Sequence, residues 1–149
     1  MGVGRKIAVA WLALLAAALA PAATAQVPDP YARDLAQRLA HVESVMSDED
    51  YMRAAGPFFG PLSTGGGRRF TMNLRAGQEY RIVGVCDGRC SDLDLRAVFA
   101  GQVVAEDLAP DVTPVLHIQP RVTGPYEVQA LMVRCRGDPC WFAFNVYSR

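Results

Sequence analysis

The stretch DLDLRAVF at residues 92–99 shows the clearest structural pattern in the chain. Its apolar side chains occupy every second position, and polar residues fill most of the positions between them: the apolar set is Leu93, Leu95, Ala97 and Phe99. Successive side chains of a strand point to opposite faces of a sheet. This period of two therefore predicts a β-strand with one buried face.

The same period extends outward from this stretch in both directions. Further runs of this kind, separated by glycine and proline turns, lie at residues 70–74, 80–85, 102–106, 114–120, 126–132 and 142–146. About seven or eight short strands at such close spacing are typical of an antiparallel β-sandwich or barrel. The sequence therefore predicts a mainly β domain over residues 68–149.

A helical period precedes the strands. Apolar residues recur at steps of three and four at Tyr31, Leu35, Leu39, Val42 and Met46. This spacing predicts one amphipathic helix within residues 26–50, with Asp29 as its N-cap, Pro30 in its first turn and its end near Ser47. An isolated helix of this length is marginal in water, so its apolar stripe must be covered by the β domain, the simpler arrangement, or by a partner.

Residues 51–67 separate the predicted helix from the strands. They contain the pairs Gly56-Pro57 and Gly60-Pro61 and the run Gly65-Gly66-Gly67. Such a density of glycine and proline opposes a long regular element, so we expect a Gly/Pro-rich loop here. Its apolar residues suggest that the loop is held against the core: Phe58, Phe59 and Leu62.

Residues 1–25 have the features of a signal peptide. Arg5 and Lys6 precede an apolar run at residues 7–20, and a small-x-small triplet suited to signal peptidase follows at residues 23–25. The run is shorter than the roughly 20 residues that a membrane-spanning helix needs. We therefore expect cleavage before Gln26, no membrane span after cleavage, and a protein that is exported to the periplasm or secreted.

The composition limits the class of protein. Of the 149 residues, 51% are hydrophobic and 20% are charged, which is suited to one compact domain. The 15 basic and 15 acidic side chains balance each other. This balance excludes a nucleic-acid binder that works through a strongly basic surface.

The four cysteines form two close pairs, Cys86 with Cys90 and Cys135 with Cys140. An even number in an exported chain favours disulfide bonds, and the spacing departs from the paired C-x2-C of a structural zinc site. Bridges between the two clusters would close longer loops and stabilise the fold more. Each cluster lies between two predicted strands, however, so the sequence favours two local bridges that each close a hairpin end.

Three fragments resemble the strand signatures of the bacterial pre-peptidase C-terminal domain: GQEYRI at 77–82, DLDL at 92–95 and GPYEV at 124–128. The resemblance covers about residues 68–149 and implies a jelly-roll-like β-sandwich on a secreted bacterial protein. The paired cysteines and the helix within residues 26–50 have no counterpart in the general pattern of that family. The resemblance thus implies a free-standing exported relative, and some similar domains bind calcium or fibrous protein.

Few residues offer catalytic chemistry. His117 lies between two apolar residues of a predicted strand and is expected to point to the opposite face. No cysteine remains as a nucleophile once both bridges form, and the sequence contains neither a Gly-x-Ser-x-Gly nor a His-Glu-x-x-His motif. We assign no catalytic residue and no cofactor, and a small hydrolase that uses His117 with an aspartate is the rival interpretation.

Asp92 and Asp94 are the strongest candidates for a cation. Residues two apart on a strand share a face, and both carboxylates suit Ca²⁺, with Asp87, Asp107 or Asp111 as further ligands. Calcium needs six to eight oxygens, so one Asp-x-Asp pair is weak support. We favour a polar strand face and assign no metal ligand.

Arg136-Gly137-Asp138 lies between Cys135 and Cys140. A local bridge would display this tripeptide on a constrained loop, as in the adhesion motif that integrins recognise. Gly-Asp-Pro is also ordinary turn sequence, which is the simpler interpretation.

The sequence as a whole predicts a non-catalytic exported binding or accessory module with a protein or polymer as ligand. The alternatives are a structural subunit that docks through its N-terminal helix and the hydrolase that uses His117.

Overall fold

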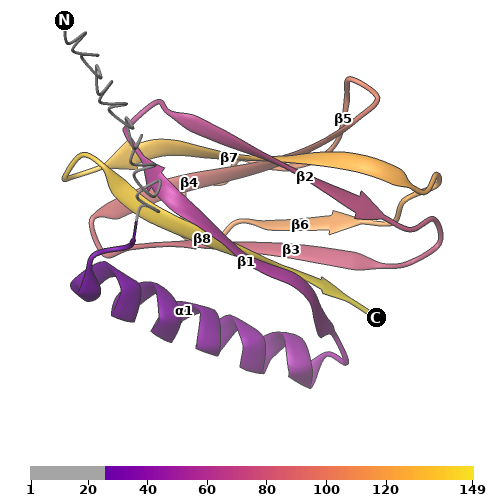
Figure 1. The fold of residues 1–149 in the computed structure, drawn as a ribbon, viewed down its shortest axis with the longest axis horizontal. Coiled ribbons are helices and arrows are strands. Elements are labelled where there is room, and N and C mark those ends of the chain that lie inside the picture. Colours follow the sequence, from indigo (N-terminus) through magenta and orange to yellow (C-terminus); the bar gives the residue numbers. More distant parts are fainter. Residues whose placement is uncertain (1–25) are drawn as a thin grey trace, which may run out of the picture.

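The computed structural model describes residues 26–149, so the predicted signal peptide lies outside the described residues. Two four-stranded antiparallel sheets pack face to face (Figure 1). The first sheet has the strand order β1 (Met52–Leu62), β8 (Cys140–Ser148), β3 (Tyr80–Cys86) and β6 (Val115–Ile118). The second has the order β2 (Gly67–Leu74), β7 (Gly124–Cys135), β4 (Cys90–Phe99) and β5 (Gln102–Asp107).

The strand order is that of a jelly roll. The chain changes sheet at every connection except that from β4 to β5, so that β1, β3, β6 and β8 share one sheet while β2, β4, β5 and β7 share the other. Every strand pair is antiparallel. This arrangement confirms the predicted mainly β, jelly-roll-like sandwich.

The main core lies between the two sheets and uses the residues that the period of two singled out. Leu93, Leu95 and Ala97 of β4 are fully buried, and so are alternate residues of β7 and β8 such as Val128 and Phe144. The aromatic rings of Phe58, Phe70, Phe142 and Phe144 contact one another across the two sheets. The alternation therefore reports the buried face correctly on both sides of the sandwich.

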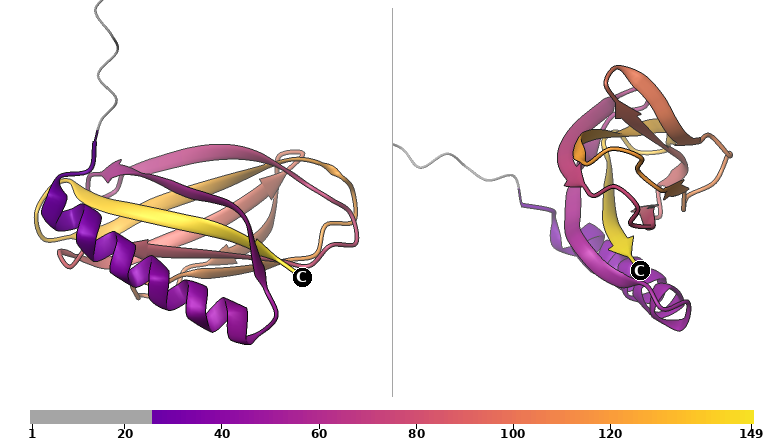
Figure 2. Two further views of the ribbon diagram at one scale, coloured as in Figure 1. Left: turned by 60° about the horizontal axis from the view of Figure 1, so that its bottom comes forward. Right: turned by 90° about the vertical axis from the view of Figure 1, so that its right-hand side faces the viewer.

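The helix α1 (Asp29–Asp48) runs along the outer face of the first sheet (Figure 2). Its buried residues are Leu35, Val42 and Met46, three of the five that the helical period predicts. They pack on the helix-facing side chains Val83, Val85, Trp141, Ala143 and Tyr147. The apolar stripe is thus covered within the chain, and no helix among the described residues is long and apolar enough to span a membrane.

The start of the helix differs from the sequence prediction. Pro28 occupies the N-cap position and Asp29 already lies in the first turn, where its side chain makes no capping hydrogen bond. The predicted N-cap at Asp29 is therefore wrong by one residue. A carboxylate in the first turn still stabilises the helix through its dipole, which explains why Asp29 suits either position.

The predicted loop at residues 51–67 is wrong, because most of it forms β1. This strand lies at the edge of its sheet, where one side of the backbone needs no ladder partner and proline is tolerated. The pairing with β8 shifts between Arg53 and Ala55 and again between Ala55 and Phe58, so Gly56 and Pro57 fall in an irregular part of the ladder. Edge position and bulge together let a Gly/Pro-rich sequence form a strand.

We predict that the helix stabilises the sheet through its buried stripe. Leu35 is 4% exposed, so Leu35→Ala should lower the free energy of unfolding by about 3 kcal/mol through lost burial and a residual cavity. Val45, on the same helix, is 39% exposed, and Val45→Ala should change that free energy by less than about 0.5 kcal/mol. Urea denaturation of both variants measures the difference, and equal effects would contradict the packing of α1 on the sheet.

Candidate functional site

The structure places His117 in a cleft of about 350 Å³ at the end of the sandwich where β6 leads into β7. His117 lies on β6 opposite Arg81 of β3, and its side chain is exposed. Arg121 follows in the connection to β7 and also lines the cleft. Exposed apolar side chains, Val104 and Val122, complete the walls.

The floor of this cleft is fixed by aromatic packing. The rings of Phe99 and Tyr126 stack with their centroids 4.4 Å apart. The Tyr126 hydroxyl donates to the carbonyl oxygen of Val122 at 3.0 Å and so holds the loop before β7 in place. A side chain on Gly124 would begin 3.2 Å from the Phe99 ring, so this glycine allows the loop to approach the stack closely.

The side chains that line the cleft are basic, neutral polar and apolar. His117 and Arg121 are its basic residues, Gln119 and Tyr126 add neutral polar groups, and no carboxylate is found among the described residues that line it. General-base catalysis by histidine normally relies on a group that orients the ring and a nucleophile within hydrogen-bond reach. The lining instead suits an anionic group carried on an apolar body.

Asp92 and Asp94 lie close together on β4, as predicted, but not on a solvated face. Asp92 is 6% exposed, and one carboxylate oxygen of each residue is buried without a hydrogen bond. Burial first, and then the negative charges of Asp92, Asp107 and Asp111, raise the pKa of the Asp94 carboxyl above its usual value. Of the predicted further ligands, Asp107 and Asp111 are thus close enough to influence Asp94.

These carboxylates do not form a metal cage. Asp107 accepts hydrogen bonds from the backbone N–H groups of Ala109 and Val115, and Asp111 accepts one from Thr113. Asp87 instead accepts hydrogen bonds from Arg89 and from the Trp141 backbone. Within residues 26–149 no group of three or more His, Cys, Asp or Glu side chains is arranged to hold a metal ion.

We predict that Asp94 destabilises the fold at neutral pH. A carboxyl whose pKa is raised on folding lowers the free energy of unfolding when it is ionised. This loss of stability develops as the pH rises from the unfolded-state pKa through the folded-state pKa. Asp94→Asn should therefore raise the free energy of unfolding at pH 7 by about 0.5–1 kcal/mol. The gain should vanish towards about pH 4, near the pKa of a carboxyl in the unfolded chain.

The matched control is Asp138→Asn, because Asp138 is exposed in the loop between Cys135 and Cys140. It should change the stability little at either pH. A calcium-dependent rise in melting temperature that Asp94→Asn abolishes would contradict this account and favour a cation site.

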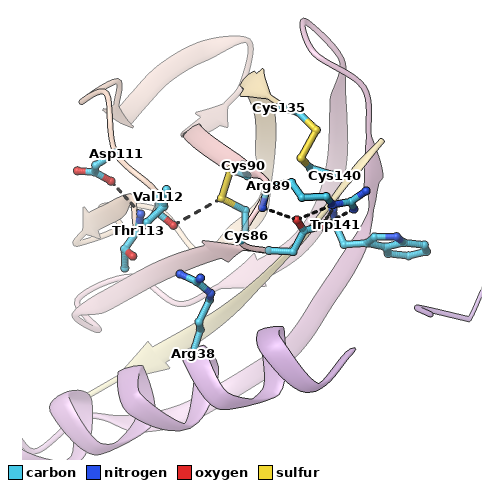
Figure 3. The surroundings of a disulfide bond; sticks show 12 residues. Arg38, Cys86, Arg89, Cys90, Asp111, Val112, Thr113, Cys135, Cys140 and Trp141 are labelled. Carbon is cyan, nitrogen blue, oxygen red and sulfur yellow. Dashed lines mark hydrogen bonds and ion pairs between the residues drawn. A yellow bond between two sulfur atoms is a disulfide. The ribbon is translucent and has the colours of Figure 1, made fainter. Parts of the chain in front are cut away.

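Both predicted disulfide pairings are confirmed, but the prediction that each closes a hairpin end is wrong. β3 and β4 belong to different sheets, and so do β7 and β8, so each bond closes a connection between the two sheets. Cys86 and Cys90 are joined with their Cα atoms 5.9 Å apart, and Cys135 and Cys140 with theirs 5.8 Å apart. Figure 3 shows the two bonds at one end of the sandwich, with Arg89 beside them. Two disulfide bonds in a chain of this size are typical of an oxidising, extracellular environment.

Asp87 connects the first disulfide loop to β8. Its buried carboxylate accepts hydrogen bonds from the Arg89 backbone at 2.9 Å, from the Arg89 guanidinium at 3.0 and 2.8 Å, and from the Trp141 backbone at 2.7 Å. Burial raises the pKa of Asp87, but these hydrogen bonds outweigh the burial and hold the pKa below its usual value. Asp87 is therefore a structural residue and not a cation ligand.

Arg89 links the two disulfide loops to the helix. Its guanidinium donates to the carbonyl oxygen of Gly137 at 3.0 Å and lies 3.8 Å from the centre of the Tyr31 ring. Arg136 and Asp138 remain exposed, so the tripeptide at 136–138 is displayed on a constrained loop. The constraint agrees with the sequence interpretation, and recognition of this tripeptide by a receptor stays a prediction.

We predict that removing the Asp87 charge loosens this end of the molecule. Asp87→Asn leaves Arg89 without its buried counter-ion and should lower the free energy of unfolding at pH 7 by about 3 kcal/mol. A carboxyl with a lowered folded-state pKa contributes stability above its unfolded pKa and loses it as the pH falls through the folded one. The difference between variant and wild type should therefore shrink below about pH 4, and a difference independent of pH would contradict the ion pair.

One candidate residue escaped the sequence analysis. Asn145 on β8 is 1% exposed and lies beneath an open groove of about 340 Å³ between α1 and β1. Its side-chain oxygen Oδ1 has no hydrogen-bond partner. The available signal was a single amide in the otherwise apolar and aromatic run CWFAFNVY at residues 140–147.

No known family model and no curated protein matches the chain.

Proposed function

We propose that the protein is a non-catalytic binding module, exported to the periplasm or secreted, and a free-standing relative of the pre-peptidase C-terminal domain. The jelly-roll sandwich and the two local disulfide bonds support this proposal. The ligand is a protein or a polymer that carries anionic groups beside apolar ones. The cleft at residues 117–126 is its binding site.

The proposal depends chiefly on the chemistry of this cleft. His117 and Arg121 provide hydrogen-bond donors, and Arg121 carries a permanent positive charge at neutral pH. Val104 and Val122 are 46% and 54% exposed, so both offer apolar surface beside these donors that a ligand can cover. The stacked aromatic floor keeps these groups in place before the ligand arrives, so little entropy is lost on binding.

A carboxylate next to an aliphatic side chain fits this lining best. Arg121 can form a bidentate ion pair with the carboxylate, and the two valines can bury the aliphatic group. An extended protein segment offers such a combination at an acidic residue or at its C-terminus. The combination of a basic side chain with exposed apolar ones in the cleft therefore favours a protein segment over a neutral polysaccharide.

The two alternatives find less support. A hydrolase that uses His117 would need an aspartate near the ring, whereas no carboxylate is among the described residues that line the cleft. A subunit that docks through its helix would need an uncovered apolar stripe, whereas the stripe of α1 packs on the chain's own first sheet. The binding module is the interpretation in which the exposed His117, Arg121 and valines of the cleft contact a ligand directly.

We predict that peptides selected from an arrayed library by the mature protein combine a carboxylate with an adjacent aliphatic residue. Arg121→Gln should weaken the binding of these peptides by about tenfold or more, because a charge-assisted hydrogen bond is lost. Val122→Glu should weaken it at least as strongly through charge repulsion. Fluorescence anisotropy with the selected peptides measures both effects.

The matched control is Val133→Glu, because Val133 is also exposed, at 41%, but lies on β7 outside the cleft. This variant should bind as wild type does. Selected peptides without acidic groups, or equal losses in the control, would contradict the proposed site. Hydrolysis of a substrate that is lost in His117→Ala would instead establish the rival enzyme.

A further inference from the structure

The strand β6 forms one edge of the first sheet and pairs on one side only, with β3 (Figure 1). In an antiparallel pair, a residue either exchanges both of its main-chain hydrogen bonds with the partner strand or directs both groups away from it, and the two kinds alternate along the strand. Every second residue of β6 therefore directs its main-chain N–H and C=O groups towards the free edge.

The hydrogen bonds of β3 determine which residues these are. The Gly84 N–H donates to the carbonyl oxygen of Pro114, on the β6 side, at 2.9 Å. The Asp87 N–H donates to the carbonyl oxygen of Trp141, on the β8 side, at 2.9 Å. The register of β3 with both neighbours is unbroken, so its even-numbered residues bond to β6 and its odd-numbered residues bond to β8.

His117 consequently presents its main chain to the free edge. Leu116 and Ile118 lie opposite even-numbered residues of β3 and form their hydrogen bonds with that strand. His117 lies between them, opposite Arg81, and its N–H and C=O point away from β3. Within residues 26–149 neither group has another main-chain partner. The residue that lines the cleft thus offers one donor and one acceptor at a sheet edge.

Val115 supports this assignment and shows where the edge is closed. Two residues before His117, it must also face the free edge, and its N–H donates to Asp107 Oδ2 at 2.8 Å. A main-chain group that is occupied in this way cannot pair with a further strand. The edge of β6 is therefore blocked at Val115 and open at His117, where the cleft begins.

Two other edge strands carry features that oppose the addition of a strand. Pro57 and Pro61 lie in β1, whose register with β8 shifts twice. Glu106 and Asp107 lie in β5, whose register with β4 also shifts. Prolines, bulges and charges at an edge prevent unwanted pairing. The ladder of β6 has neither a proline nor a register shift.

We propose that the protein ligand binds as an extended segment that adds a strand to β6 at His117. One residue of the segment exchanges main-chain hydrogen bonds with His117, while its acidic group pairs with Arg121 and its aliphatic side chain lies between Val104 and Val122. This inference rests on the proposed function, because it uses the same cleft. β6 has only four residues, so the main-chain pairing sets the conformation of the ligand and the cleft supplies the rest of the affinity.

The proposal specifies the kind of partner. A helix uses its main-chain groups internally, and a strand within a folded sheet has paired them already, so neither can pair with His117. An unstructured tail or loop has these groups free and can become ordered on the edge of β6. The partner is therefore a protein that presents an extended, unstructured segment.

The test compares His117→Pro with His117→Ala, using fluorescence anisotropy and the peptides selected by the wild-type protein. Both variants lose the imidazole ring, but only proline also removes the main-chain N–H. That N–H is not part of the ladder with β3, and proline is accepted at such edge positions. His117→Pro should bind the peptides about tenfold more weakly than His117→Ala does.

The matched control is Thr71→Pro on β2, an edge of the second sheet. The Met132 N–H donates to the carbonyl oxygen of Gly66 at 2.9 Å, so in the register of β2 with β7 the N–H of Thr71 also faces a free edge. Thr71 is exposed and does not line the cleft. Thr71→Pro should bind as wild type does, and melting curves show whether each proline variant is folded.

A scan of the peptide tests the same contact without altering the protein. Each amide of a selected peptide is methylated in turn. Methylation at the residue opposite His117 removes a hydrogen-bond donor and should weaken binding about tenfold, whereas methylation at the next residue, whose N–H points away from β6, should change binding little. This alternation is the signature of an added strand.

Strand addition is overturned if folded His117→Pro and His117→Ala bind equally, or if methylation shows no alternation, while Arg121→Gln still weakens binding. In that result the cleft binds the segment through side chains alone, and the proposed function survives. If no peptide is selected, the proposed function itself fails. A dimer of the free protein that His117→Pro dissociates would assign this edge to a second copy of the chain and overturn the proposal.

Discussion

The carboxylate of Asp87 is the group on which the end of the sandwich with the two disulfide bonds depends. It is buried and accepts four hydrogen bonds, three from Arg89 and one from the Trp141 backbone. Through Arg89 it orients the second disulfide loop at Gly137 and the start of the helix at Tyr31. A buried carboxylate is tolerated only where its charge is fully paired, so losing any one of these hydrogen bonds destabilises the others.

The two outer faces of the sandwich differ in character. The outer face of the first sheet is apolar and covered by α1, while the second sheet carries ion pairs across neighbouring strands, such as Arg69 with Glu127 and Arg96 with Glu106. Departures from an ideal fold gather under the helix, where a bulged edge strand faces a buried amide. Local conflicts of this kind tend to mark functional positions, because stability alone would remove them.

Most of the fold follows from periodicity, because the period of two and the helical period each report which face is buried. Leu93, Leu95 and Ala97 show this for β4, and Leu35 and Val42 for α1. The strand β1 could not be predicted in this way. Its glycines and prolines oppose a strand locally, and only its place at the edge of the sheet, a tertiary property, makes them acceptable.

The candidate sites were harder to predict than the fold. The sequence identified His117 and the two disulfide pairs, but periodicity does not report that the loop at residues 119–122 closes over a stacked Phe99 and Tyr126. It also treated Asp92 and Asp94 as a polar face, whereas Asp92 is buried. Asn145 was missed because its significance depends on a bulge in a strand about 90 positions away along the chain.

The pairing of β1 with β8 brings the beginning and the end of the described chain into one sheet. A polypeptide emerges from the ribosome with its N-terminus first, so α1 and β1 are made while their partner strand does not yet exist. The helix contacts Trp141, Ala143 and Tyr147, all on β8, and β1 forms its ladder with the same strand. Such non-local pairings form slowly. The apolar face of α1 and the inner edge of β1 can therefore be covered only after β8 has been made, and a chain without residues 140–148 would lose the strand that joins β1 to β3.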